Sequence, residues 1–476
     1  MDELILKNLI AGKGISGGNT FAVNSDFYEE FSTQVGDATI FDIKMATSKA
    51  NAIAKECNQI PFEDRKKILN TAAKKIRFST EDLEYIVRYT GMPITRVKKH
   101  VEEIRTTLQT IPELVEKRIG IKHGKIARKP LIGENFFKVL NSINGFVYAV
   151  TPANDPRVTA FVSAWLVTLG IPVVFKVAAT DVLTAQKIIA AILDSGYPAA
   201  GINQLCWDTK REEKHRLNFD LVDSATAIWA FGDNKTVDRL LRLEETEQGN
   251  IDHFADKIVL RHISGRAAGV YDGVYDAKKT AKIIVESALD WPIGCNAMKA
   301  VFDASKKGEL EQELLEKFKE YEKYTGDPLK EKTKVGYVKP QLNNQVYERI
   351  QSLGKLGLIT RLNGIRKEAH QTTPILLVTE DNHSEFLSKE YSTYILAIKP
   401  CDTFETAIND VNYSAGEEHR LALSIFSDEE DAILKATLKA HHIKRIRHST
   451  ELDLLFHEGN DYLHKLTIPQ IHRVNF

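Results

Sequence analysis

The chain has 476 residues, which exceeds the size of one simple hydrophobic core and predicts two or three domains. Apolar residues make up 43% and charged residues 27%, a composition typical of a soluble globular protein. The formal net charge of −1 provides no electrostatic reason to bind nucleic acid or an acidic membrane, so we expect neither partner.

The start of the chain, MDELILKNLIAGKG, lacks a basic segment followed by a long apolar one, so it does not predict a secretory signal. The longest apolar tract, residues 158–175, is interrupted by Gly170 and Pro172. This interruption predicts a helix followed by a strand and argues against a membrane span.

Residues 44–119 carry apolar side chains at helical spacing, and the sequence STEDLE within them is typical of a helix start. From residue 145 onward, apolar strand patterns alternate with helical patterns, which predicts a parallel sheet covered by helices. We expect strands at 145–150, 172–176, 203–208, 227–232 and 257–262, and helices at 157–169, 181–195 and 234–243.

A second alternating block follows. We expect strands at 269–273, 298–303, 374–379, 394–399, 421–426 and 444–448, and helices at 276–288, 308–323, 402–410 and 428–440. The whole pattern predicts an α/β protein with two doubly wound parallel-sheet domains. The first domain is expected to hold a nucleotide, and the second contains Cys295.

The four cysteines, Cys57, Cys206, Cys295 and Cys401, are scattered along the chain. Their number and spacing match neither a disulfide framework nor a metal site, which indicates the reducing cytoplasm and no bound metal. Cys295 differs from the others because it lies in the turn of DWPIGCNAMKAVFD, residues 290–303, where backbone amides can stabilise a thiolate. From these residues alone, a buried structural cysteine remains the alternative.

Four segments, in this order, resemble the aldehyde dehydrogenase superfamily: FVYAVTPANDPRVTAF, GIPVVFKVAATDVLTAQKIIAAILDSGYPAAGINQL, PIGCNAMKAVFD, and the long segment that begins KEYSTYILAIKP. The likeness covers roughly residues 44–450. It implies an NAD(P)-binding domain at 1–125 and 145–262 and a catalytic domain at 263–450. We also expect a homo-oligomer. Residues 126–144 and the last stretch, 451–476, which fits no ordinary member of the family, are expected to be contact or tail elements.

The same resemblance implies the site residues. Cys295 would be the nucleophile, and the Asn154 amide would donate to the oxyanion together with the Cys295 backbone N–H. The cofactor would contact Thr151 and Pro152 in the turn, Lys176 at the adenosine ribose, Gly232 at the pyrophosphate and Glu390 at the nicotinamide ribose. A turn asparagine before Pro156 and a lysine exposed at a strand end remain the structural alternatives for Asn154 and Lys176.

Smaller departures from the family pattern affect the cofactor site. Val237 stands where the family has a second glycine, and Ser392 and Thr393 replace the usual aromatic residue and glycine after Glu390. Most NAD-preferring relatives place a glutamate three residues after the lysine, and here that position is Ala179. Without this carboxylate nothing repels a 2′-phosphate, so we expect NADP to be preferred or tolerated and NAD to be possible.

The departure with the largest consequence concerns the general base. The family's glutamate falls on His262, 33 residues before Cys295, and the segment IVLRHISGRAAGVY, residues 258–271, contains no carboxylate. Branches of the family without this base exchange the acyl group with a thiol such as coenzyme A. His262 is either a substitute base, since imidazole ordinarily titrates near pH ~6.5, or a structural histidine at a strand end.

These features are similar to those of the fatty-acyl reductase branch that serves bacterial luminescence. We therefore expect a cytoplasmic NAD(P)H-dependent oxidoreductase that interconverts an acyl thioester, such as an acyl-CoA, and an aldehyde through a thioester on Cys295. Its partners would be a small aldehyde or acyl substrate and coenzyme A or another thiol carrier. One alternative is a hydrolytic aldehyde dehydrogenase, and another is a non-catalytic assembly partner.

Overall fold

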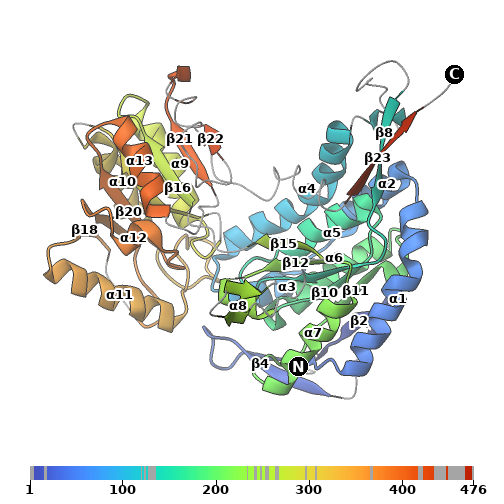
Figure 1. Ribbon diagram of the computed structural model, residues 1–476. Helices are drawn as coiled ribbons and strands as arrows, with labels where there is room; N and C mark the ends of the chain where they lie inside the picture. Colours follow the sequence, from blue (N-terminus) through green and yellow to red (C-terminus); the bar gives the residue numbers. More distant parts are fainter. Residues whose placement is uncertain are drawn as a thin grey trace.

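The computed structural model describes residues 5–15, 19–119, 121–122, 125–126, 136–232, 234–240, 244–246, 249–251, 257–262, 267–294, 297–305, 308–364, 368–415, 422–431, 433, 446–448 and 467–473. Figure 1 shows two lobes, each built around one sheet. The first sheet ends in sequence at His262, and the second begins at Ala267.

The first lobe contains a seven-stranded sheet. Its five strands from the α/β region are parallel to one another, and two strands from the N-terminal region continue the sheet in antiparallel pairs. The strand order is β15 (Ile258–His262), β12 (Ala227–Phe231), β9 (Val147–Val150), β10 (Val173–Lys176), β11 (Ile202–Leu205), β2 (Asn8–Ile10) and β3 (Lys13–Ile15). A smaller sheet has the order β1 (Ile5–Leu6), β5 (Ser32–Gly36) and β4 (Thr20–Asn24).

The expected helical region 44–119 forms four helices, α1 (Ile40–Gln59), α2 (Phe62–Lys75), α3 (Thr80–Thr90) and α4 (Ile94–Ile119). The STEDLE segment starts α3 with a capping box, in which Ser79 and Asp82 each accept a hydrogen bond from the other's backbone N–H. Further along the chain lie α5 (Val158–Leu169), α6 (Val182–Leu193), α7 (His215–Ser224) and α8 (Asn234–Leu240).

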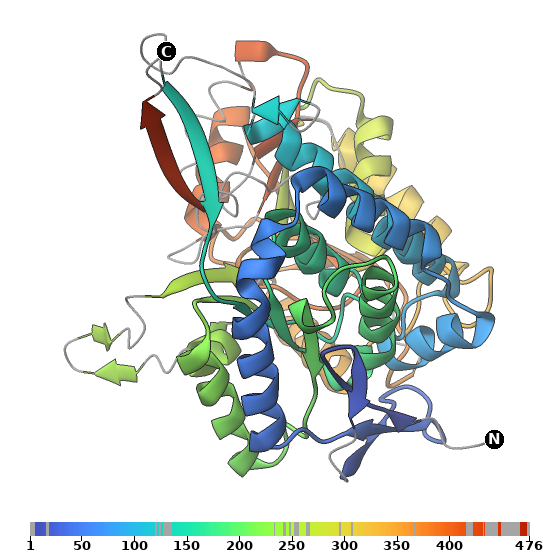
Figure 2. The ribbon, with the colours of Figure 1, turned by 90° about the vertical axis from the view of Figure 1, so that its right-hand side faces the viewer.

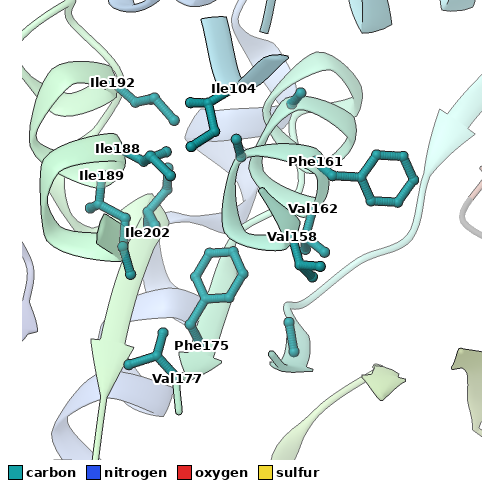
Figure 3. Close-up of a cluster of buried hydrophobic side chains, with 14 of the residues drawn as sticks. Ile104, Val158, Phe161, Val162, Phe175, Val177, Ile188, Ile189, Ile192 and Ile202 are labelled. Carbon is teal, nitrogen blue, oxygen red and sulfur yellow. The ribbon is translucent and has the colours of Figure 1, made fainter. Parts of the chain in front are cut away.

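The core of the first lobe lies where α4, α5 and α6 pack on the sheet. Figure 3 shows Ile104 of α4 and Phe175 of β10 beside side chains of α6 and β11, whereas the Phe161 ring points to the other side of α5, where its centre lies 5.7 Å from that of Trp229. Every residue of α5 is buried, which explains why its sequence is apolar on all sides. Each fully buried side chain of this size contributes about 1.5–3 kcal/mol to folding.

The second lobe repeats this plan with a seven-stranded sheet that is parallel except for one edge strand. Its order is β18 (Thr360–Asn363), β19 (Ile375–Val378), β20 (Ile395–Pro400), β17 (Met298–Asp303), β16 (Ala267–Tyr271), β21 (Leu423–Phe426) and β22 (Ile446–His448). The helices are α9 (Ala277–Leu289), α10 (Glu309–Glu322), α11 (Pro340–Lys355), α12 (Glu385–Ser388) and α13 (Phe404–Ala415).

Helices cover both faces of this second sheet. Residues of β17 contribute to two cores: Met298 and Val301 pack in the core with α9 and α10, and Ala300 and Phe302 pack in the core with α11, α12 and α13. The predicted fold class, α/β with two doubly wound sheets, is therefore confirmed. The antiparallel edge strands, α7 and α11 were not among the expected elements, and most of the expected helix 428–440 lies outside the described residues.

Three short two-stranded pairs complete the structure: β6 (Ile121–Lys122) with β7 (Lys125–Ile126), β13 (Glu244–Thr246) with β14 (Gly249–Ile251), and β8 (Phe136–Ser142) with β23 (Thr467–Arg473). The β8–β23 pair joins two segments that are far apart in sequence into an arm that projects from the first lobe (Figures 1 and 2). Among the helices that the structure describes, none has the length and apolar content needed to cross a membrane.

Candidate functional site

Three of the expected cofactor or catalytic positions lie at the carboxyl edge of the first sheet. Lys176 is level with Val150 on β9, and His262 is level with Phe231, the residue before Gly232. The strand order reverses at β9, which has β10 on one side and β12 on the other. In sheets of this kind, ligands bind at the carboxyl edge beside such a reversal.

Two further expected positions precede strands of the second sheet in the sequence, at its amino edge. Glu390 precedes β20, Cys295 precedes β17, and these two strands are parallel neighbours. Cys295 itself lies outside the described residues, and the described residues on its two sides are joined by a hydrogen bond of 3.0 Å from the Ala297 N–H to the Gly294 carbonyl.

Asn154 connects these two edges. Its side-chain Nδ2 donates to the carbonyl of Ile293 at 2.7 Å, and its own carbonyl accepts a hydrogen bond of 2.9 Å from Nε1 of Trp291. A carboxamide has two N–H donors, and the Ile293 bond uses one of them. The structure therefore places the Asn154 amide against the turn that carries Cys295, as a group with further donor capacity.

A buried ion network holds the Asn154 loop against α4. Nε and Nη2 of Arg157 bind the two carboxylate oxygens of Asp155 at 2.9 and 2.8 Å, and Nη1 binds Glu103 at 2.6 Å. The Arg157 side chain is only 5% exposed, so these charge-assisted bonds are screened little by water. The sequence interpretation missed this network, although Asp155 and Arg157 flank Pro156 in the quoted motif.

A second branch of the network reaches the other lobe. Arg96 on α4 contacts Asp290 at 2.5 Å and Glu103 at 3.7 Å. Asp290 immediately precedes Trp291, whose indole binds Asn154. The two segments that Asn154 joins by hydrogen bonds, its own loop and residues 291–293, are thus both anchored to α4. The sequence interpretation also missed Trp291 and Asp290.

Lys176 is mostly buried, with its ammonium 5.6 Å from the centre of the Trp207 ring. Burial lowers the pKa of Lys176, and a Coulombic interaction with Cys206 opposes this effect. Within the described part of the chain, no carboxylate forms an ion pair with this lysine. A buried ammonium without a carboxylate fits a role in binding ligand hydroxyls.

The remaining expected cofactor positions surround Lys176. Thr151 is buried, and its backbone N–H donates to the Lys176 carbonyl at 3.1 Å. Pro152 and Ala179 are partly exposed, and Ala179 begins the 3₁₀ helix Ala179–Asp181. These residues line the same stretch of the sheet edge, and Ala179 adds no charge to it.

Gly232 and His262 interact directly at the ends of β12 and β15. The Gly232 N–H donates to the His262 carbonyl at 3.1 Å, and the imidazole lies 4.6 Å from the Phe231 ring, tilted by 30°. A Cβ added at Gly232 would meet only Thr236 and Val237, at 3.5 Å or more. Packing against the described residues therefore does not require a glycine at this position.

Lys299 is a buried residue of the site that the sequence interpretation missed. It is 4% exposed, and its ammonium donates to the carbonyls of Pro292 and Thr393, the latter at 3.4 Å. Burial lowers the pKa of Lys299 to about 8, and the nearby charge of Glu390 opposes this shift. The sequence signal was available, because Lys299 is the only cation in the apolar strand MKAVFD.

The other three cysteines are protonated thiols. Burial raises the pKa of Cys57 to about 11, and that of both Cys206 and Cys401 to about 12. Cys57 and Cys206 are fully buried, and Cys401 is half-buried beside Asp410. None of the three is placed to act as a nucleophile at neutral pH.

We therefore predict that iodoacetamide at pH 8 modifies Cys295 at least ~10-fold faster than the other three cysteines, because only thiolates react. Peptide mass spectrometry after short labelling times measures the four rates. The Cys295→Ala variant is the control and should show only slow labelling. Faster labelling of Cys401 than of Cys295 would contradict the assignment of the nucleophile.

His100 is a buried histidine in the network that supports Asn154. Its ring meets the Trp291 ring edge-on, with 6.4 Å between the centres, and its Nε2 lies 4.0 Å from a Glu103 oxygen. Burial lowers the pKa of His100, and the charges of Arg157, Arg96 and Lys99 lower it further. The folded protein therefore holds this ring neutral.

The lowered pKa predicts acid sensitivity. Below pH ~6.5 an unfolded chain protonates this histidine while the folded protein does not, so stability is present above that pH and is lost as the pH falls. The melting temperature should fall less between pH 7.5 and 5 in His100→Leu than in the wild type. The exposed His383→Leu is the control, and it should follow the wild-type curve. Parallel curves for wild type and His100→Leu would refute the prediction.

Comparisons with known proteins agree with this geometry. The sequence matches the profile described as the aldehyde dehydrogenase family over residues 15–442. A 1-pyrroline-5-carboxylate dehydrogenase from Staphylococcus haemolyticus is 24% identical over 422 residues, covering 85% of this chain and 78% of the relative.

Solved structures show the same fold at low identity. An NAD-dependent benzaldehyde dehydrogenase from Corynebacterium glutamicum superposes with a TM-score of 0.80 at 19% identity, over 99% of this chain and 98% of the other. An NADP-dependent glyceraldehyde-3-phosphate dehydrogenase from Bacillus halodurans has a TM-score of 0.80 at 18% identity, over 99% and 100%. The likeness to fatty-acyl reductases remains a prediction, since these relatives have other names. The profile match and the shared fold together show that this chain belongs to the aldehyde dehydrogenase family.

Proposed function

We propose that the protein oxidises a small aldehyde to the carboxylic acid with NADP or NAD, through a thioester on Cys295. The observation that carries this proposal is the hydrogen bond from Asn154 to Ile293, which sets an amide donor against the turn of the nucleophile. The names of the relatives reported above, all dehydrogenases, support it over the acyl-CoA reduction expected from the sequence.

In this proposal the Cys295 sulfur attacks the aldehyde carbon and forms a hemithioacetal. The second N–H of Asn154 and the Cys295 backbone N–H donate to the oxyanion. One such donor lowers the activation free energy by about 2.7–4 kcal/mol. NAD(P), which Lys176, Gly232 and Glu390 would hold, would supply the oxidant for the hydride that leaves the substrate carbon. The acyl group then remains on Cys295 as a thioester, and water attacks it to release the carboxylate and the thiol.

The cofactor would be held by Thr151, Pro152, Lys176, Gly232 and Glu390. The buried Lys176 ammonium and the free space at Gly232 support this placement. Ala179 places no carboxylate beside Lys176 at the adenosine ribose, so NADP is accepted and NAD remains a substrate. The solved relatives include one enzyme described as NADP-dependent and another as NAD-dependent.

His262 would be the base that activates water. It ends β15 at the same sheet edge as Lys176, and the Phe231 ring restricts the orientation of its imidazole. An oriented imidazole can take a proton from water and return it to the leaving thiolate. The family has a glutamate at this position, so the base role of His262 rests on the chemistry of its imidazole and not on the family pattern.

A second candidate follows from that same position. His262 replaces the family's carboxylate, and residues 258–271 contain no acidic side chain. If water is not activated, the acyl group leaves Cys295 to a thiol such as coenzyme A, and in reverse an acyl thioester is reduced to the aldehyde.

We also propose how the chain divides into domains and which segments form subunit contacts. Residues 1–125 and 145–262 would form the cofactor domain and 263–450 the catalytic domain, which is supported by the division of the two sheets after His262. Residues 126–144 and 451–476 would mediate contacts in a cytoplasmic homo-oligomer, which is supported by the pairing of β8 with β23.

The product distinguishes the two candidates. Aldehyde and NADP without any thiol should give steady accumulation of carboxylic acid, and His262→Ala should slow it about 10²–10⁴-fold because the base is lost. Coupled absorbance and chromatography of the acid measure both. A burst of one reduced cofactor per site, followed by turnover only on addition of coenzyme A, would favour the acyl-transfer candidate instead. No cofactor binding in a fluorescence titration would favour a non-catalytic protein.

Cofactor choice provides an independent test. In Ala179→Glu the new carboxylate repels the 2′-phosphate, so the Kd for NADPH should rise about tenfold more than the Kd for NADH. Ala179→Gln has nearly the same size without the charge, and it should affect both cofactors equally. An equal loss for both cofactors in Ala179→Glu would show that Ala179 does not face the adenosine ribose.

A further inference from the structure

The ammonium of Lys299 connects two segments of the amino edge of the second sheet. One acceptor, the Pro292 carbonyl, lies three residues before Cys295. The other acceptor, the Thr393 carbonyl at 3.4 Å, lies three residues after Glu390. One side chain therefore joins the segment of the nucleophile to the segment of the nicotinamide-ribose carboxylate.

The nucleophile turn is held from two sides at consecutive carbonyls. Asn154 of the first lobe binds the Ile293 carbonyl, and Lys299 of the second lobe binds the Pro292 carbonyl. The Asn154 bond fixes the turn relative to the first lobe. The Lys299 bonds fix the turn relative to the segment of Glu390 through the Thr393 carbonyl. The hydrogen bonds of Asn154 described above do not reach that segment.

Burying the Lys299 ammonium costs desolvation free energy, which a side chain that only fills space would not incur. A neighbouring buried lysine, Lys399 on β20, forms an ion pair of 2.9 Å with Asp410. Among the described residues, Lys299 forms no such pair and binds backbone carbonyls, and its lowered pKa reflects that desolvation. A methionine would fill the same volume without this cost, so the ammonium has another role than packing.

We propose that Lys299 is a positioning residue, which sets the separation between the Cys295 turn and the Glu390 segment through the carbonyls of Pro292 and Thr393. This inference rests on the proposed function, in which Cys295 holds the substrate carbon and Glu390 orients the nicotinamide ribose. Hydride transfer depends on that separation, and a displacement of ~1 Å can lower a rate about 100-fold.

The test compares Lys299→Met with the double variant Lys399→Met, Asp410→Leu, which removes a buried lysine and its partner one strand away. Lys299→Met should lower kcat about 10–100-fold and leave the NADPH Kd and the aldehyde KM within threefold of wild type. The control should keep all three values within threefold. Wild-type kcat in folded Lys299→Met would overturn the proposal.

Chemical rescue separates the hydrogen-bonding role from packing. In Lys299→Ala, propylammonium should restore kcat several-fold, whereas propanol, of similar size but uncharged, should not. Equal rescue by both would overturn the proposal. If Lys299→Met does not fold, Lys299→Arg tests the same distance, because its longer side chain should displace the turn and lower kcat with the NADPH Kd retained. Wild-type kcat in folded Lys299→Arg would equally overturn it.

A readout without turnover keeps this inference distinct from the proposed function. The iodoacetamide rate at Cys295 should change at least ~5-fold in Lys299→Met, while the rates at Cys57, Cys206 and Cys401 stay unchanged. That result stands even if no aldehyde is oxidised, which would refute only the proposed function. An unchanged Cys295 rate in the folded variant would refute the positioning role.

Discussion

The joint between Asn154 and residues 291–293 is the interaction on which the rest of the site depends. The first sheet brings its carboxyl edge, and the second sheet its amino edge, but neither edge contains a complete set of groups for the chemistry. The Asn154 amide and the Trp291 indole bind each other's segments at 2.7 and 2.9 Å, across a sequence separation of more than 130 residues. These two bonds turn two separate strand edges into one site.

The hydrogen bonds between Asn154 and residues 291–293 are supported by a network of ion pairs, in which each charge is compensated by its neighbours. Arg157, Asp155, Glu103, Arg96 and Asp290 tie the Asn154 loop and the end of α9 to the same helix, α4. Removing Asp155 or Glu103, which pair with the buried Arg157, leaves an uncompensated charge, at a cost of about 3–5 kcal/mol. His100 stays neutral within this set, because burial lowers the pKa of its imidazole and the charges of Arg157 and Arg96 lower it further.

The sequence predicted the elements and edges of this fold better than its contacts. The alternation of apolar strand patterns with helical patterns predicted the parallel strands of both sheets, and the family resemblance placed Lys176, Gly232 and His262 at the ends of three of them. The polar helix α11 was missed, although its buried residues Asn343, Val346, Ile350 and Leu353 recur at helical spacing. The Arg96–Asp290 and Lys299–Thr393 contacts could not be predicted, because their partners are 194 and 94 residues apart and no local pattern links them.

The departures from the family pattern affect the two halves of the reaction unequally. Attack on the carbonyl and loss of hydride require Cys295, Asn154 and a bound cofactor, and both candidate functions share these steps. They diverge only when the acyl group leaves Cys295, and His262 is the altered position that bears on that step. Its imidazole lies against Phe231 at the end of β15, and the segment 258–271 contains no acidic side chain. The two candidate functions therefore share the oxidation of the aldehyde carbon and differ only in the group that takes the acyl from Cys295.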